Sequence, residues 1–379
     1  MITLYFIGIL CTFYVLYVVV DKFLIPTIYI LKDKIGLTDD QTGALTSFVS
    51  SAPELSVSII SLIIAIQSND AKKFEEIAAL GPAAVIGSAL FSVLFIVGAS
   101  AWFAGKKLTW HSITRDMVYY IFAVLALFFT LSNGKVEWYE GIVLLLLYVV
   151  YAVIVSNWPK ISSKLLKLQP TLIKSTVIIA EDVKDSEEKL IHLRDQKWSP
   201  LNAIEKLSAY LFFSLKSGYN GFQVSYNIII SVFLVIVSSY FMVEWASQLA
   251  VSLKVPQAII GLTILAAGTS VPDLLASIKT AREGYADTAV TNAIGSNVFD
   301  VLGNLGLTWT IAAIFRVGAP VAVDTNSLNG SIVLLIASSV VLLLLLFAKK
   351  FNLSRPVSIF LMASYICYVA VICFQSLPR

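Results

Sequence analysis

Charged residues are scarce in this chain. Only 13% of its 379 residues are Asp, Glu, Lys or Arg, whereas 58% are hydrophobic. A soluble domain carries about 25% charged residues, so this composition predicts a membrane protein. The formal net charge of +3 gives no strongly basic surface, and we expect no nucleic-acid partner.

Cysteine and histidine are nearly absent as well. Cys11, Cys367 and Cys373 lie in apolar stretches, and their odd number favours neither a disulfide framework nor a thiolate metal site. We predict that they are packing residues. His111 and His192 lie outside the apolar stretches, and the chain has no His-Glu-x-x-His motif and no phosphate-binding loop. We therefore expect neither an enzyme nor a protein with a cofactor.

The abundant feature is long apolar blocks of about 20 residues, the length that crosses a bilayer. Their boundaries fall near 3–31, 41–67, 77–104, 116–132, 139–157, 226–247, 255–280, 286–315, 327–348 and 356–376. This pattern predicts an all-α polytopic membrane protein with ten transmembrane helices.

Lysine and arginine in the loops between these blocks predict the orientation, because they concentrate on the cytoplasmic side. Loops after odd-numbered spans carry Lys32, Lys34, Lys106, Lys107, Arg115, Lys279, Arg282, Lys349, Lys350 and Arg355. Loops after even-numbered spans carry Lys72, Lys73, Lys135, Lys254 and Arg316. The bias places the amino terminus outside and the polar stretch 158–225 in the cytosol.

Two motifs occur twice. Ser51-Ala-Pro-Glu-Leu-Ser-Val-Ser-Ile59 is repeated, with changes, as Ser270-Val-Pro-Asp-Leu-Leu-Ala-Ser-Ile278. Ile86-Gly-Ser-Ala-Leu-Phe-Ser-Val-Leu94 is repeated as Ile294-Gly-Ser-Asn-Val-Phe-Asp-Val-Leu302. Two paired motifs in the same order indicate an internal duplication.

The duplication predicts inverted repeats, since each motif recurs five spans later and an odd displacement reverses the direction of crossing. We therefore divide the chain into a first five-helix repeat at 1–157, the cytosolic loop 158–225, and a second repeat at 226–379. Transporters with such repeats hold their ions at the midplane between the halves.

A proline and a carboxylate inside each first motif indicate a cation site. Pro53 and Pro272 have no amide hydrogen, so the carbonyls of Val49 and Gly268 lose their helical partner. Glu54 and Asp273 add negative oxygen at the same level, and an acid in the bilayer interior is a functional-site hypothesis. Neutral oxygen within one turn comes from Ser50, Ser51, Thr269 and Ser270. Calcium and sodium prefer such oxygen ligands.

The second motif adds polar side chains on one helix face. Ser296 and Asp300 are four residues apart, as are Ser88 and Ser92, so each pair shares a face. Asp300 is an additional carboxylate, and Asn304, one turn later, is expected to pair with a polar neighbour. Gly87 and Gly295 are expected to permit close helix packing.

These motifs resemble the alpha-1 and alpha-2 repeats of the calcium/cation antiporter superfamily, at 43–95 and 261–309, and most of all the potassium-dependent sodium/calcium exchangers. The resemblance implies ten helices as two inverted five-helix repeats with broken helices 2 and 7. It implies a central pair Glu54 and Asp273. The remaining implied ligands are Ser47, Ser50, Ser51, Ala266, Thr269, Ser270, Ser88 and Ser296. In the potassium-dependent branch, the position of Asp300 is associated with potassium use.

The first repeat departs from the family pattern. Ser47-Phe-Val49 replaces a run of small residues, and Ser92 replaces an asparagine, with a shorter side chain that changes a sodium or calcium contact. These departures leave ion selectivity and stoichiometry open, but they do not change the predicted fold.

The sequence thus predicts a secondary antiporter that exchanges sodium for calcium by alternating access, with potassium co-transport left open. A calcium/proton exchanger, a passive cation channel and a non-transporting regulatory relative are the alternatives. The expected partners are the lipid bilayer and the ions calcium, sodium and, in the potassium-dependent branch, potassium. A monomer is sufficient, and a homodimer is compatible. We expect residence in a plasma or cytoplasmic membrane.

Overall fold

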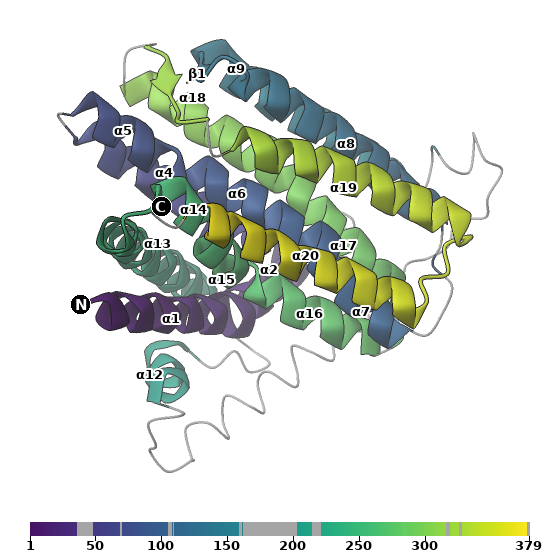
Figure 1. Ribbon diagram of the computed structural model, residues 1–379. Helices are drawn as coiled ribbons and strands as arrows, with labels where there is room; N and C mark the ends of the chain where they lie inside the picture. Colours follow the sequence, from purple (N-terminus) through teal and green to yellow (C-terminus); the bar gives the residue numbers. More distant parts are fainter. Residues whose placement is uncertain are drawn as a thin grey trace.

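The chain folds into a bundle of long helices (Figure 1). The computed structural model describes residues 1–35, 48–68, 70–104, 108, 110–158, 161, 203–213, 221–282, 284, 286–315, 319–325 and 328–376. The elements of the amino-terminal part are α1 (Ile2–Val19), η1 (Val20–Leu24), α2 (Ile25–Ile35), α4 (Ala52–Ile66), α5 (Ala71–Ala78), α6 (Leu80–Leu90), η2 (Phe91–Ile96), α7 (Val97–Ala104), α8 (Trp110–Leu131), β1 (Lys135–Val136) and α9 (Trp138–Ser156).

The carboxy-terminal part is also built of α-helices with short π-helical segments and one short strand. Its elements are α12 (Ala203–Leu211), α13 (Gly221–Leu253), α14 (Gln257–Ile260), η3 (Gly261–Leu265), α15 (Ala266–Thr269), α16 (Val271–Arg282), α17 (Ala286–Val298), η4 (Phe299–Asn304), α18 (Leu305–Phe315), β2 (Val321–Ala322), α19 (Asn329–Ala348) and α20 (Arg355–Ser376). The elements labelled η are short π-helical turns within longer helices, a feature that is frequent at functional sites.

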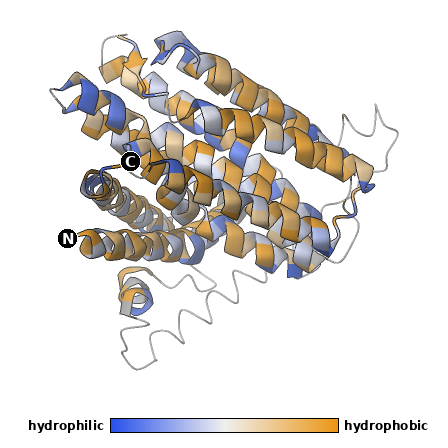
Figure 2. Ribbon diagram, in the orientation of Figure 1, coloured by the Kyte–Doolittle hydropathy of each residue, from blue (hydrophilic) through white to orange (hydrophobic). Residues whose placement is uncertain are grey.

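The apolar helices are long enough to cross a bilayer. Eight helices of the described part meet the length and composition of a membrane span. The pair Gln257–Thr269 and Val271–Arg282 meets them jointly, bent by 41°, and Ala52–Ile66 is a shorter apolar helix. Hydrophobic residues cover the long helices, whereas hydrophilic residues gather at α5 and the ends of the bundle (Figure 2). The protein is therefore an integral membrane protein, as the composition predicts.

Two expectations about single residues are wrong. Cys11, Cys367 and Cys373 are exposed rather than packed in the interior, because the outer surface of a membrane helix is as apolar as its core and hydropathy does not separate the two faces. Arg115, assigned above to a loop, lies inside α8 and pairs with Asp116, with Arg115 Nε 2.7 Å from Asp116 Oδ1. The lysine and arginine bias remains in the same direction without it.

Small residues bring the central helices into close contact. The apolar 18-residue window within Ala71–Phe103 is 94% buried, more than that of any other span of the described part. A Cβ atom on Gly261 would lie 2.7 Å from the Cβ of Ala83, and one on Gly87 would collide with the backbone of Leu262. Helix α6 therefore crosses the η3 segment at a distance that only small residues permit.

Backbone contacts between loops show which helix ends share a side of the bundle. Strands β1 and β2 pair antiparallel, with Lys135 opposite Ala322 and Val136 opposite Val321. The amide of Leu108 donates to the carbonyl of Phe351, 2.8 Å away. The connection after α8 thus lies beside the one after α18, and the connection after α7 lies beside the one after α19.

Candidate functional site

Both proline-acid motifs lie at an interruption between two helical segments. Ser51 precedes α4 with φ −84° and ψ 8°, and Ser270 follows α15 with φ −90° and ψ 1°. These backbone angles fall in the sparsely populated bridge region, which is common at active sites. A proline follows two residues later in each case, where its missing amide hydrogen costs little. The two motifs therefore share the same local geometry.

The interruption puts each acid in the first turn of a helix. Glu54 lies in the first turn of α4 and Asp273 in the first turn of α16, where the positive end of the helix dipole favours a carboxylate. Glu54 is 1% exposed and Asp273 is 5% exposed. Asp300, in η4, is 1% exposed and interacts electrostatically with both other acids. Three carboxylates from three helices are thus buried near one another.

Hydroxyl groups connect the two repeats at this point. The Oγ atoms of Ser88 and Ser270 are 2.6 Å apart. The Ser270 hydroxyl also lies 3.5 Å from Glu54 Oε1, to which it donates. A continuous polar contact therefore runs from α6 through the bend after α15 to α4, and it joins both sequence motifs of the first repeat to one motif of the second.

Several oxygen atoms at the centre remain available to a ligand. Glu54 Oε2 and Asp300 Oδ1 are buried and have no hydrogen-bond partner within the described residues. The Ser51 hydroxyl is buried beside the Asp300 carboxylate. A buried acceptor without a partner is costly, and an ion or water that supplies the missing contact removes this cost. The described ranges contain no cluster of three or more His, Cys, Asp or Glu close enough to hold a metal alone. Hydroxyl and carbonyl oxygens would have to complete a cation shell.

The other predicted ligands vary in their surroundings. Thr269 lies beside Glu54 but also donates to the carbonyl of Leu265 at 3.1 Å. Ser296 donates to the carbonyl of Ala293 in its own helix at 3.2 Å, so it is turned toward its own backbone. Ser50, Ser92 and Ala266 are buried. Ser47 lies outside the described residues.

Sequence reasoning did not single out three buried polar side chains near the acids. Ser58 and Ser277 follow Glu54 and Asp273 by one helical turn, and both hydroxyls lack a partner in the described part of the chain. Asn297, next to Ser296, is 1% exposed, and neither atom of its carboxamide has a partner among those residues. The repeat contained the signal for the serines, because Ser58 and Ser277 are matched positions.

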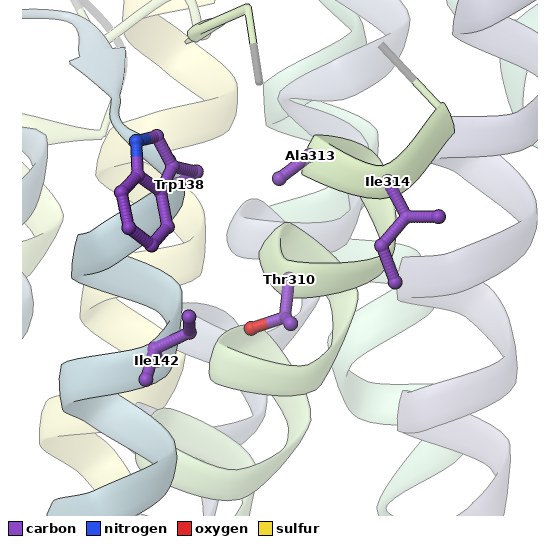
Figure 3. Close-up of a pocket in the computed structure, with 5 residues that line it drawn as sticks. All are labelled: Trp138, Ile142, Thr310, Ala313 and Ile314. Atoms are coloured by element: carbon purple, nitrogen blue, oxygen red, sulfur yellow. The ribbon is translucent and has the colours of Figure 1, made fainter. Parts of the chain in front are cut away.

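A surface groove between α9 and α18 is chemically unsuited to ions. It is lined by Trp138, Ile142, Thr310, Ala313 and Ile314 (Figure 3). The Thr310 hydroxyl, its only polar side-chain group besides the indole nitrogen of Trp138, donates to the carbonyl of Gly306 at 2.7 Å. Ile314 is 73% exposed, so this groove opens on the apolar outer surface and leaves the buried acids as the candidate site.

Comparisons with known families agree with the motif resemblance. A family model described as sodium/calcium exchanger protein matches residues 5–157 and 226–374. These two ranges include the helices on both sides of the stretch 158–225 and contain Glu54, Asp273 and Asp300.

Individual relatives are distant in sequence, but their alignments cover most of this chain. The sodium/potassium/calcium exchanger 4 of Mus musculus is 25% identical, and the alignment covers 98% of this chain and 80% of that protein. The human sodium/potassium/calcium exchanger 5 is 27% identical, with 88% and 77% covered.

Solved structures resemble the fold. The sodium-calcium exchanger NCX_Mj soaked with 10 mM Na+ and 10 mM Sr2+ has a TM-score of 0.54 at 20% identity, with 98% of this chain and 99% of that chain covered. Native YfkE has a TM-score of 0.56 at 14% identity, with 98% and 91% covered.

Proposed function

Because the chain belongs to the sodium/calcium exchanger protein family, we propose that it exchanges sodium for calcium across a membrane at the buried Glu54 and Asp273. The observation that carries this proposal is that Glu54 of the first repeat accepts from Ser270 of the second, whose hydroxyl also bonds that of Ser88. Asp273 and Asp300 of the second repeat lie near enough to interact electrostatically with Glu54. The family consists of ion transporters rather than enzymes and needs no cofactor.

The proposed topology has ten transmembrane helices in two inverted five-helix repeats, 1–157 and 226–379. The eight span-like helices, the bent pair and the shorter Ala52–Ile66 would supply these ten segments. Helices 2 and 7 would be the broken ones, with their interruptions at Ser51 and Ser270. The amino terminus would lie outside and 158–225 in the cytosol of a plasma or cytoplasmic membrane. The protein would function as a monomer, with which a homodimer is compatible.

Competition between ions would couple their movements. Glu54, Asp273 and Asp300 supply at most three negative charges, and a low-dielectric interior makes uncompensated positive charge costly. Calcium together with several sodium ions would exceed this charge. Filling the site with one species would therefore favour release of the other, and alternating access would carry each to the opposite side.

A sodium gradient across proteoliposomes is expected to drive calcium accumulation against its own gradient. Calcium flux that only dissipates its gradient would instead indicate a passive channel. Accumulation that follows a pH gradient without sodium would indicate a calcium/proton exchanger. Absence of flux under every gradient would support a non-transporting regulatory relative.

Asp300 is proposed to determine potassium use, and two observations support this. One oxygen of its buried carboxylate has no partner in the described residues, and several relatives are named sodium/potassium/calcium exchangers. Replacing Asp300 with Asn is expected to remove most of the stimulation of calcium flux by potassium, because the neutral amide attracts a cation less strongly. Flux would be measured with and without potassium, with Asp287→Asn at the start of α17 as the matched control. An unchanged potassium response would contradict the assignment.

A further inference from the structure

Helix α12 lies within the central stretch 158–225, and it is bound to the side of α1. Glu205 accepts a hydrogen bond from the Tyr14 hydroxyl at 2.9 Å and from Lys22 Nζ at 2.5 Å. Burial raises the pKa of Glu205, but the two hydrogen bonds and the charge of Lys22 outweigh it and hold the pKa below its usual value. Glu205 is therefore ionised at neutral pH. One side chain thus binds Tyr14 of α1 and Lys22 of η1, the segment that follows α1.

The carboxy-terminal end of α12 is attached independently. The ring of Phe212 is buried and stacks on Phe23 of η1, with 4.0 Å between ring centroids and 14° between ring planes. The backbone of Phe213 pairs with the carboxamide of Asn227 on α13. Its amide donates to Asn227 Oδ1 and its carbonyl accepts from Asn227 Nδ2, both at 3.0 Å. The two residues that follow α12 therefore contact η1 and α13.

Helix α1 in turn contacts the bend next to the ion site. The ring of Phe13 lies directly over Gly268, so close that a Cβ atom on this glycine would overlap it. Gly268 immediately precedes Thr269 and Ser270, and Phe13 immediately precedes Tyr14, which binds Glu205. Two adjacent residues of α1 thus make the two contacts: Phe13 contacts the bend, and Tyr14 contacts α12.

Helices α1 and α13 form a peripheral pair on one flank of the bundle (Figure 1). Only 28% of the apolar 18-residue window in the span Ile2–Ile28, which begins with α1, and 33% of that in α13 are buried, against 94% of the window in Ala71–Phe103. A peripheral helix with little buried surface has fewer packing contacts to lose when it shifts. Of all the contacts that fix the position of α1, those with α12 are therefore a larger share than they would be for a central helix.

The structure also has its site closed to solvent, since Glu54, Ser51, Ser270 and Asp300 are each at most 1% exposed. We propose that α12 is a clamp that holds α1 over the bend at Gly268 and keeps the site closed, with Glu205 as the positioning residue. The proposal rests on the exchange function stated above. The central stretch would then slow exchange through its docking to α1, and releasing α12 would let the site open more often.

The test measures sodium-driven calcium flux in proteoliposomes, per folded full-length protein, for Glu205→Gln and, separately, Asn227→Ala. Each variant releases one end of α12, and we expect a maximal rate about threefold higher, within the range of coupling seen for residues outside a binding site. Glu76→Gln is the matched control, because Glu76 lies 4.0 Å from Lys72 in an exposed pair on α5. Its rate should equal that of the wild type.

Hydrogen exchange provides the second readout, which does not require transport. Amide exchange in 8–24 and 266–274 should accelerate in both release variants and stay unchanged in Glu76→Gln. An unchanged or lower rate per folded protein, or unchanged exchange in these segments, would overturn the clamp. A contact that is merely structural would lower thermal stability without raising the rate. Wild-type protein that shows no sodium-driven flux would instead refute the proposed function, while hydrogen exchange would still report on the clamp.

Discussion

Calcium transport is expected to disappear when Glu54 is replaced with Gln or Asp273 with Asn. Loss of an outer partner of a metal ligand costs about 10–100-fold in affinity or activity, so loss of a direct carboxylate ligand should cost about 100-fold or more. Both substitutions preserve side-chain shape and remove a buried charge from the first turn of a helix. Sodium-driven calcium uptake in proteoliposomes measures the effect.

Folding is not expected to suffer in these variants, because a buried carboxylate without a complete set of partners is itself costly. Size-exclusion profile and thermal stability should therefore match or exceed those of the wild type. Glu244→Gln is the matched control: Glu244 lies on α13, and its carboxylate accepts from Gln248 at 3.1 Å in an exposed i, i+4 pair. This control should transport normally. Normal uptake in Glu54→Gln or Asp273→Asn would remove both acids from the site.

Replacing Gly87 with Ala is expected to destabilise the protein severely. The added Cβ would collide with the carbonyl oxygen of Leu262 and lie 2.5 Å from the Cβ of Ala266. These are atoms of backbone and of a rigid side chain, so the helices themselves must separate. Overpacking in a core costs about 3 kcal/mol when side chains cannot adjust, and we expect at least this loss. The melting temperature and folded yield in detergent would show it.

The equivalent glycine of the second repeat provides the control. A Cβ on Gly295 would meet only the Tyr151 hydroxyl, at 3.4 Å, which is an ordinary contact. Gly295→Ala should therefore keep near-wild-type stability, although the sequence predicts the same packing role for both glycines. Equal stability losses in the two variants would contradict the asymmetric packing described here.

Much of the site was predictable from the sequence because its determinants are local. A proline, an acid and flanking hydroxyls within a few residues are sufficient to specify a helix interruption with a carboxylate in the next turn, as Glu54 and Asp273 illustrate. The sequence is also sufficient to predict that both acids face the protein interior. A charge that faces lipid costs far more free energy than one buried among polar groups.

The remaining features depend on distances between segments, which hydropathy does not encode. The carboxamide of Asn297, which has no partner among the described residues, and the unequal surroundings of Gly87 and Gly295 arise from which helices cross at each point. The exposed Cys11 shows the same limit, since lipid and protein interior favour the same residues. The docking of Glu205 on Lys22 joins positions 183 residues apart, and neither local sequence contains a sign of the other.

The two backbone contacts between loops have a mechanical consequence. The pairing of β1 with β2 ties α8 and α9 to α18 and α19. The bond from Leu108 to Phe351 ties α7 and α8 to α19 and α20. The helices joined in this way form a frame, because they cannot slide past one another without breaking one of these backbone hydrogen bonds. Among the described residues, α1 and α13 take part in neither of these two contacts, so we expect the movements of the transport cycle to be made by them against this frame.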